Sequence, residues 1–219
     1  YCGSNSSPNL SNVRLENNEA YRGGGIYCGY NSSAVLLNIF INQNSAWEGG
    51  GLYCSQSNTN LSHVLILKNI ASYEGGGIKC WNSNDTFEYV DLVANISNKG
   101  GGISLRSSNS TLENVSILKN IASTEGDGIY CNYSSPNLLR VSLYENSEQG
   151  MYVNAGNPNV TESNIFYNGT GIYNYDNSSI ISATNNYWGH SSGPYHPSQN
   201  PSGLGDSTNA FVNVTPWLT

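Results

Sequence analysis

Short segments in which apolar and polar side chains alternate recur along the whole chain. Val13-Arg14-Leu15 and Ile26-Tyr27-Cys28 alternate in this way, and Ile39-Phe40-Ile41 and Val64-Leu65-Ile66 are runs of similar length rich in β-branched residues. A period of two residues indicates β-strands. No segment repeats its apolar residues every 3.6 positions, as the buried face of a helix does. The pattern therefore predicts an all-β protein made of very short strands.

One position of this pattern returns at a nearly constant spacing. The intervals are 26, 26, 26, 25, 26, 22 and 21 residues between the pairs Tyr1-Cys2, Tyr27-Cys28, Tyr53-Cys54, Lys79-Cys80, Ser104-Leu105, Tyr130-Cys131, Tyr152-Val153 and Tyr173-Asn174. A fixed period predicts stacked repeats, and this one is too short for a propeller blade of about 40 residues. Since the same residue types return in the same slots, each coil should lie in register on the previous one, about 4.8 Å away. We expect a parallel β-helix (solenoid) of about seven to eight coils over residues 1–184, with an aperiodic capping segment of the same domain over residues 185–219.

Two columns of equivalent residues support stacked coils. The more regular one is the asparagine column Asn18, Asn44, Asn69, Asn95, Asn120, Asn146 and Asn168. An amide stacked on its copy donates and accepts hydrogen bonds along the axis, so we interpret this column as a structural ladder rather than a ligand site. A less regular column consists of Asn12, Asn38, His63, Tyr89, Asn114, Arg140 and Asn164.

Glycine and cysteine also keep fixed places in the repeat. The triplets Gly23-Gly24-Gly25, Gly49-Gly50-Gly51, Gly75-Gly76-Gly77 and Gly100-Gly101-Gly102, and then Gly126-Asp127-Gly128, mark a bend before each Tyr-Cys strand. Cys2, Cys28, Cys54, Cys80 and Cys131 share one slot with Leu105 and Val153, so the slot should face the core. We expect reduced thiols that pack as small apolar groups, with disulfides between adjacent coils as the alternative.

The pairing of G-G-G-I/L with I/L-x-x-N, as in Leu15 to Asn18 and Ile41 to Asn44, resembles a known repeat. It is similar to the GGAI and FxxN repeats of polymorphic outer-membrane-protein-type β-helices, with Gly for Ala and Ile or Leu for Phe. The tail, with Asn185-Asn186-Tyr187-Trp188-Gly189 and Ser192-Gly193-Pro194, resembles a segment common in secreted right-handed parallel β-helix proteins. The resemblance covers nearly the whole chain. It implies right-handed coils and a secreted or surface-exposed setting, but no particular reaction.

Composition and charge limit the classes of binding partner that the protein could have. The net charge is −7, with 8 basic and 15 acidic residues, which argues against nucleic acid or an anionic membrane surface as a partner. No apolar run approaches the roughly 20 residues of a membrane span. Only 11% of residues are charged, and the chain is rich in Asn, Ser, Gly and Tyr, so we expect an extracellular or cell-surface location.

Candidate catalytic residues are scattered. Glu48 and Glu74 share a slot on adjacent coils, at a separation of about 5 Å that would suit a retaining glycosidase. Their column reads Arg22, Glu48, Glu74, Lys99 and Glu125, mostly alternating in sign, which favours a solvated row of surface charges. No C-x-x-C spacing or histidine cluster suggests a metal. We therefore expect no catalytic residues, no metal and no cofactor, and the sequence favours a protein that is not an enzyme over one that is.

Two surface features are candidates for recognition. An outward aromatic face for glycan or protein is expected from Tyr1, Tyr27, Tyr53, Tyr130, Tyr152 and Tyr173, with Trp47 at the neighbouring corner. Stacking of the rings along the sheet is the alternative explanation. Candidate glycosylation sites in the corner after the cysteine strand are Asn5, Asn31, Asn84, Asn109, Asn132 and Asn177.

Tyr1-Cys2 is already in register with the repeat, so an uncapped N-terminal coil could pair with another chain. Either the chain is trimmed from a longer protein or the open coil meets another subunit, and we expect self-association through this coil. The sequence favours a non-catalytic extracellular structural or adhesive protein, glycosylated, that acts as a filament or surface-layer subunit with a glycan or host-surface partner. A carbohydrate-binding or polysaccharide-degrading β-helix is the alternative.

Overall fold

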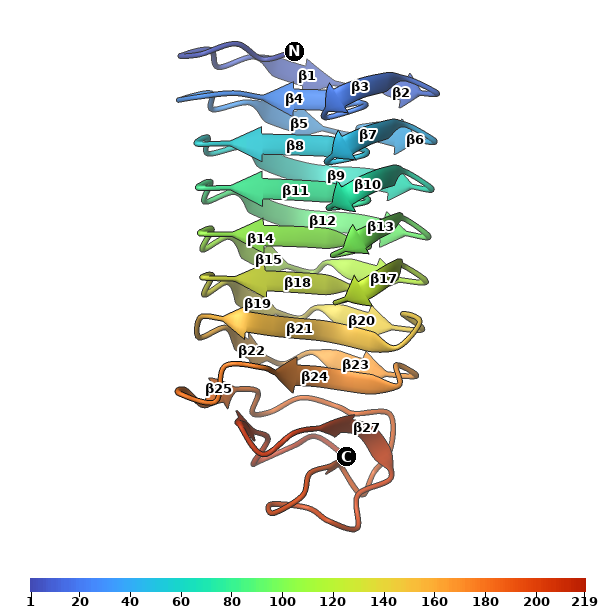
Figure 1. Ribbon diagram of the computed structural model, residues 1–219, viewed down its shortest axis with the longest axis vertical. Helices are drawn as coiled ribbons and strands as arrows, with labels where there is room; N and C mark the ends of the chain where they lie inside the picture. Colours follow the sequence, from blue (N-terminus) through green and yellow to red (C-terminus); the bar gives the residue numbers. More distant parts are fainter.

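Strands one repeat apart lie side by side in the computed structural model, which describes residues 1–219. The pairing between coils is parallel and in register, for example Tyr27 with Tyr53 and Cys28 with Cys54. Strands at the front of Figure 1 run to the left, and those behind run to the right, while the chain descends from the N- to the C-terminus. The coils therefore wind as a right-handed screw, and the fold is a right-handed parallel β-helix without helical segments.

Three sheets run along the axis. The front sheet contains β4 (Ile26–Cys28), β8 (Leu52–Ser55), β11 (Ile78–Trp81), β14 (Ile103–Arg106), β18 (Ile129–Asn132), β21 (Gln149–Ala155), β24 (Thr170–Asn174), β27 (Gly205–Thr208) and β26 (Pro194–Tyr195). The corner sheet contains β3 (Glu19–Arg22), β7 (Ser45–Glu48), β10 (Ile70–Glu74), β13 (Ile96–Lys99) and β17 (Ile121–Glu125).

The back sheet is the largest. Its main path follows β1 (Asn9–Ser11), β5 (Val35–Leu37), β9 (Asn60–Leu67), β12 (Thr86–Val93), β15 (Thr111–Glu113), β19 (Asn137–Leu139), β22 (Asn159–Thr161), β25 (Ile181–Ser182) and β28 (Val212–Asn213). Beside this path lie β2 (Arg14–Glu16), β6 (Phe40–Asn42), β16 (Ser116–Leu118), β20 (Ser142–Tyr144) and β23 (Asn164–Phe166). In β9 and β12 the two shorter strands of a coil are joined into one of eight residues.

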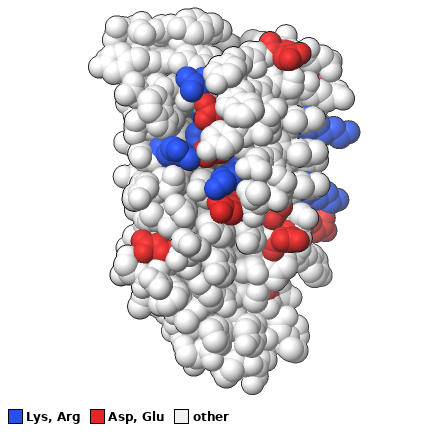
Figure 2. Space-filling view, viewed as in Figure 1, with Lys and Arg blue, Asp and Glu red and all other residues white.

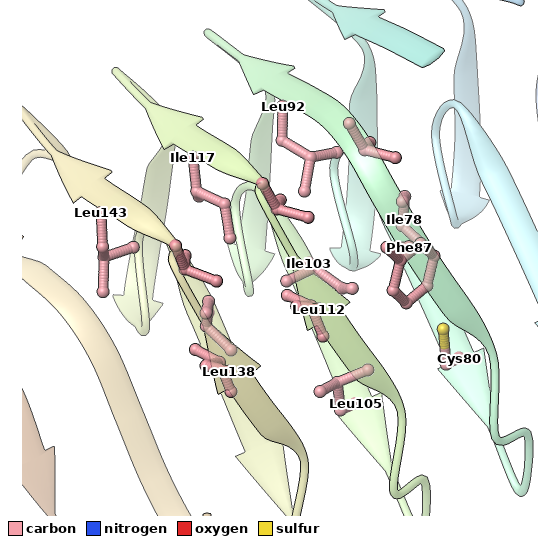
Figure 3. Close-up of a cluster of buried hydrophobic side chains, with 14 of the residues drawn as sticks. Ile78, Cys80, Phe87, Leu92, Ile103, Leu105, Leu112, Ile117, Leu138 and Leu143 are labelled. Carbon is pink, nitrogen blue, oxygen red and sulfur yellow. The ribbon is translucent and has the colours of Figure 1, made fainter. Parts of the chain in front are cut away.

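The core fills the space between the front and back sheets. It consists of 37 buried apolar residues that stack in columns, one residue from each coil. Figure 3 shows Ile78 and Cys80 of β11 beside Phe87 of β12, with Ile103 and Leu105 in the same slots one coil further on. The cysteines of the column are buried and free, so their slot faces the core as predicted.

The asparagine column forms a continuous hydrogen-bonded ladder. Asn44 Oδ1 accepts from the backbone N–H of Asn18 at 3.0 Å and from Asn18 Nδ2 at 2.9 Å. Asn44 Nδ2 donates to the carbonyl of Leu15 at 2.8 Å. The pattern repeats down to Asn168, whose N–H and Nδ2 both donate to Asp206 Oδ2 in the tail. These amides are therefore saturated by the fold itself.

Glycine is favoured in the triplets both by the backbone conformation and by the close approach of the next coil. The first glycine of each triplet has φ between +63° and +70° in Gly23, Gly49, Gly75, Gly100 and Gly126. A Cβ on Gly50, in the second position, would lie 2.5 Å from the carbonyl oxygen of Gly76. The bend between coils therefore leaves no room for a side chain in the first four triplets, whereas the fifth carries Asp127 in its second position, where the next coil is shorter.

The less regular column of the sequence is a row of left-handed residues within the back sheet. Asn12, Asn38, His63, Tyr89, Asn114 and Arg140 all have φ between +52° and +56°. The last member of the row is Glu162, at +52°, and the predicted Asn164 lies instead in β23. Asparagine tolerates this conformation better than most residues, which explains its frequency there.

The corner sheet ends where the repeat shortens. The segment between the ladder asparagine and the following glycine loses four residues from one coil to the next, running from 120 to 128 and then from 146 to 150. The Asp127 carboxylate binds backbone N–H groups where the corner sheet ends. Its Oδ1 accepts from Ala122 N at 2.7 Å, and its Oδ2 accepts from the N–H groups of Glu148 and Gln149 at 3.0 and 2.7 Å.

The tail after residue 184 continues the parallel pairing. β27 pairs with β24 of the front sheet, and β28 pairs with β25 of the back sheet. Trp188 is fully buried and joins the apolar core. The tail therefore covers the last coil while extending two of its sheets.

Candidate functional site

The tyrosine column is split into two stacks by a polar gap. Tyr1, Tyr27 and Tyr53 stack with ring centroids 5.2 and 5.4 Å apart, and a second stack contains Tyr130, Tyr152 and Tyr173 at 6.0 and 5.6 Å. Lys79 and Ser104 occupy the tyrosine slot between the two stacks. This gap lies on β11 and β14, in the middle of the front sheet.

The predicted aromatic face is therefore less accessible than expected. Tyr53 and Tyr130 are each only 2% exposed, and Tyr152 is also buried. A cation covers each stack beside the gap: the Arg22 guanidinium lies 5.2 Å from the Tyr53 ring, and Lys99 Nζ lies 5.2 Å from the Tyr130 ring. The expectation that Tyr53, Tyr130 and Tyr152 belong to one continuous exposed aromatic face is therefore wrong, because these rings are buried by their neighbours in the stacks and by the two cations.

Trp47 lies away from this column, on β7 of the corner sheet. It is exposed and stacks on Tyr73 at 5.6 Å between centroids. It also lines an open hollow of about 820 Å³ with Tyr21 and Glu19. The tyrosines of the front sheet and Trp47 are thus two separate aromatic surfaces.

Glu74 is the centre of the gap. Its carboxylate forms an ion pair with Lys79 Nζ, and its Oε1 accepts from Arg106 Nη2 at 2.7 Å. Ser104 Oγ donates to Glu74 Oε2 at 3.2 Å and accepts from Lys79 Nζ at 3.0 Å. The Glu74 side chain is fully buried and that of Lys79 is 1% exposed, so this is a buried ion pair rather than a surface contact.

The predicted row of surface charges is therefore wrong at Glu74. Arg22, Glu48, Glu74, Lys99 and Glu125 do lie in register. Arg22 pairs with Glu48 at 2.9 Å and Lys99 pairs with Glu125 at 2.7 Å, both with partial exposure. Glu74 instead turns over the front sheet, because Lys79 and Ser104 present donors where other coils present a tyrosine ring.

Neighbouring charges keep Glu74 ionised. Burial opposes ionisation of the carboxyl, but the adjacent charges of Lys79 and Arg106 outweigh it, so the pKa of Glu74 is lowered. Burial also lowers the pKa of Lys79, against the opposing effect of the Glu74 charge. Both oxygens of the carboxylate are occupied by donors.

A hollow of about 210 Å³ opens beside this cluster and is lined by Arg22, Glu48, Tyr53, Lys79, Trp81 and Arg106. Three side chains in it reach solvent: those of Arg22 and Arg106 are 43% and 37% exposed, and Trp81 is 38% exposed. Arg106 Nε has no hydrogen-bond partner. Figure 2 shows blue and red atoms side by side over the middle of this face.

Sequence reasoning missed Lys79, Ser104 and Arg106. The signal was present, because Lys79 and Ser104 are the two interruptions of an otherwise aromatic slot. Arg106 follows two residues later and points to the same face of its strand. The three-dimensional consequence, a buried carboxylate between them, depends on the register between β10, β11 and β14.

The candidate glycosylation sites differ in accessibility. Asn5, Asn31, Asn84, Asn109 and Asn177 are exposed in the loops that follow the recurring Tyr-Cys position. Asn132 is only 9% exposed and its Oδ1 accepts from Asn154 Nδ2 at 2.9 Å. Asn132, a candidate glycosylation site, lies at the end of β18 and is covered by its neighbours, in contrast to the exposed position expected for it.

A second buried carboxylate lies on the inner side of the same coil. Cys54, Cys80 and Asp85 place their sulfur and carboxylate oxygen atoms within 4.8 Å of one another. Burial raises the pKa of Asp85 to about 6 and that of the Cys80 thiol to about 11. The sequence predicted no metal-ligating group because it contains no C-x-x-C or histidine cluster, and this cluster arises only from the register of the coils.

The three-sheet solenoid places the protein in the class of right-handed parallel β-helices. Residues 93–188 match a family model described as a right handed beta helix region, and the match spans coils of the same geometry as those before it. A search of curated proteins gave no match. A search of solved structures gave none either. The structure has no helix with the length and apolar character needed to cross a bilayer.

Proposed function

We propose that this protein is a non-catalytic, extracellular adhesive β-helix that binds an acidic glycan at the hollow beside Glu74. The observation that carries the proposal is the pair of partly exposed guanidinium groups, Arg22 and Arg106, that face one hollow together with the Trp81 indole. The rest of the repeat supplies the rigid frame on which this site is held.

The side chains of the hollow suit a sugar carboxylate. Guanidinium groups bind carboxylates through charge-assisted hydrogen bonds, often with two parallel contacts. An exposed aromatic ring such as Trp81 offers an apolar face with one polar edge, which supports contact with an amphipathic ligand. The volume is below the roughly 300–1,000 Å³ of drug-sized pockets, so it fits a single sugar unit of a longer chain.

The chemistry of the cluster favours binding over catalysis. A general acid or base needs a proton that it can exchange near the working pH. Glu74 is buried, its pKa is lowered, and both of its oxygens accept from Lys79, Ser104 or Arg106. Glu48 is held by Arg22. These carboxylates therefore hold the arginines in place.

Sequence composition supports an extracellular setting. The low charge content and the five exposed sequon asparagines (Asn5, Asn31, Asn84, Asn109 and Asn177) agree with a glycosylated surface protein. Self-association through the N-terminal coil stays a prediction.

The proposal is tested by titration with oligogalacturonate and with its neutral methyl ester. We expect the acidic form to bind and the ester to bind more weakly. Arg106→Gln and Arg22→Gln should each weaken binding about tenfold to hundredfold, as expected for lost hydrogen bonds to a charged group. Arg140→Gln is the matched control, because Arg140 is similarly exposed and ion-paired but lies by the back sheet.

The outcome that contradicts the proposal is equal affinity for acid and ester, or equal losses in the Arg22, Arg106 and Arg140 variants. Prolonged incubation with the glycan should release no new reducing ends and no unsaturated products. Release of either product that disappears in Glu48→Gln would instead favour polysaccharide degradation.

A further inference from the structure

The inward side of β11 carries a cluster that the proposed function does not use. Cys54 of β8 and Cys80 of β11 are in register on adjacent coils, and Asp85 directly precedes β12. Their ligand atoms lie within 4.8 Å of one another, and all three residues are at most 1% exposed. Figure 3 shows the Cys80 sulfur among core side chains, close to Phe87.

The carboxylate of Asp85 is an anomaly within its own column. The equivalent residues on the neighbouring coils are Thr59 and Ser110, as the pairing of the following residues shows. Ser110 Oγ accepts the N–H of Asp85 at 3.2 Å, and Asp85 Oδ1 likewise accepts the N–H of Thr59 at 2.7 Å. A hydroxyl therefore suffices for the structural role of this slot.

The second oxygen of Asp85 has no such role. Asp85 Oδ2 is buried and has no hydrogen-bond partner. A buried polar atom without a partner is unfavourable by about 1–3 kcal/mol, and more when it is charged, so such atoms are rare in folded proteins. One carboxylate oxygen of Asp85 lies within 4.8 Å of both cysteine sulfur atoms, and thiols are only weak hydrogen-bond donors. A cation between these three atoms would satisfy the carboxylate and both sulfurs at once.

We propose that Cys54, Cys80 and Asp85 form an interior binding site for a thiophilic divalent cation of the Zn²⁺ or Cd²⁺ type. Two thiolates and one carboxylate match the ligand preferences of these ions, and hard cations such as Mg²⁺ and Ca²⁺ prefer oxygen alone.

Charge balance is compatible with a dry interior. On binding, each thiol loses its proton to solvent and forms a sulfur–metal bond, and the carboxylate oxygen forms a third bond. Two thiolates, one carboxylate and a divalent cation together carry one negative charge. The ionised Asp85 carries the same charge without the metal, so the ion adds none to the core.

Burial determines how the ion enters. All three ligands are closed off from solvent in the folded protein, so the ion must bind during folding or through local opening of the coils. We therefore expect slow exchange, and resistance to chelators once the ion is bound.

The test is to unfold the protein, refold it with Zn²⁺ or Cd²⁺ under reducing conditions, remove free metal, and measure metal per chain by mass spectrometry. We expect about one ion per chain, with thiolate-to-cadmium charge-transfer absorption in the ultraviolet. Cys80→Leu and Asp85→Ser should abolish both signals. Each variant carries the residue that the next coil has in the same slot, Leu105 and Ser110, so the fold should tolerate them.

Cys131→Leu is the matched control. Cys131 is equally buried in the same column, but the slot corresponding to Asp85 is Pro136 on its coil. Metal content and absorption should be unchanged in this variant. Absence of metal from the refolded wild-type protein overturns the proposal, as does equal metal in Asp85→Ser. If a variant fails to fold, a rise in the thermal midpoint of the wild-type protein on cadmium loading, without thiolate absorption, would overturn it as well.

Discussion

Glu74 and Asp85 are two buried carboxylates on opposite sides of the same strand. β11 alternates, so that Lys79 points outward to Glu74 while Cys80 points inward to Asp85. Glu74 accepts from Lys79, Ser104 and Arg106, and its pKa is lowered. Asp85 accepts from one backbone N–H and leaves its other oxygen without a partner, and burial raises its pKa to about 6.

The difference shows how one solenoid can hold two kinds of polar group. A carboxylate with cationic partners stays ionised inside the protein and fixes those partners in place. A carboxylate that lacks them destabilises the fold unless something else supplies positive charge. Glu74 has partners for both of its oxygens within the chain, whereas Oδ2 of Asp85 has no hydrogen-bond partner.

The largest effect is expected when the complete site is broken. Lys79→Met removes one partner of a buried charge and should lower the free energy of unfolding by about 3–5 kcal/mol. Chemical denaturation monitored by circular dichroism measures this change. A loss below about 1 kcal/mol, the range of surface ion pairs, would contradict the buried character of the pair.

The double variant Lys79→Met with Glu74→Leu is the control for this experiment. Replacing both members of a buried ion pair by apolar groups is often neutral or stabilising, so much of the lost stability should return. Arg106 then loses its partner but keeps access to solvent. Recovery in the double variant would show that the unpaired charge, and not the lost lysine packing, causes the effect.

A smaller effect of opposite sign is expected at the incomplete site. In metal-free protein, Asp85→Ser removes the unpartnered oxygen and should raise the free energy of unfolding by about 1–3 kcal/mol. The serine hydroxyl can still accept from Thr59 N, as Ser110 does from Asp85 N. In protein refolded with cadmium, the same substitution should be destabilising. A loss of stability without metal would mean that Asp85 is already satisfied.

The fold could be predicted from the sequence because the repeat determines it. The slot shared by Cys28, Cys54 and Cys80 faces the core, and the ladder from Asn18 to Asn168 is hydrogen-bonded throughout. Both features follow from stacking the same residue type at the same position of successive coils. Where the period changes, near Asp127, the sequence showed the shorter interval and the altered triplet, but the hydrogen bonds of the Asp127 carboxylate to the backbone could not be predicted from it.

The sites could not be predicted to the same extent because they are departures from the repeat. Lys79 and Ser104 were not recognised as site residues although they interrupt the tyrosine slot, and the approach of Glu74 from the corner sheet depends on side-chain direction. Tyr53 and Asn132 were expected to be exposed and are buried, because exposure depends on which side chains of the neighbouring coils cover each residue. Residues that recur in the same slot therefore predict the fold, whereas contacts between residues of different slots determine which side chains are exposed.

The smallest effect expected is the acid dependence of the complete site. Glu74 has a folded-state pKa below its usual value of 4.5, so its contribution to stability is fully present above that pH. The contribution is lost as the pH falls from about 4.5 through the folded-state pKa, because the unfolded state takes up the proton first. One such group contributes at most about 1.4 kcal/mol per pH unit. The free energy of unfolding, measured from neutral pH to pH values below 4.5, should therefore fall more steeply with decreasing pH in the wild-type protein than in the double variant at Lys79 and Glu74. Parallel curves would mean that Glu74 is not held as a carboxylate by its neighbours.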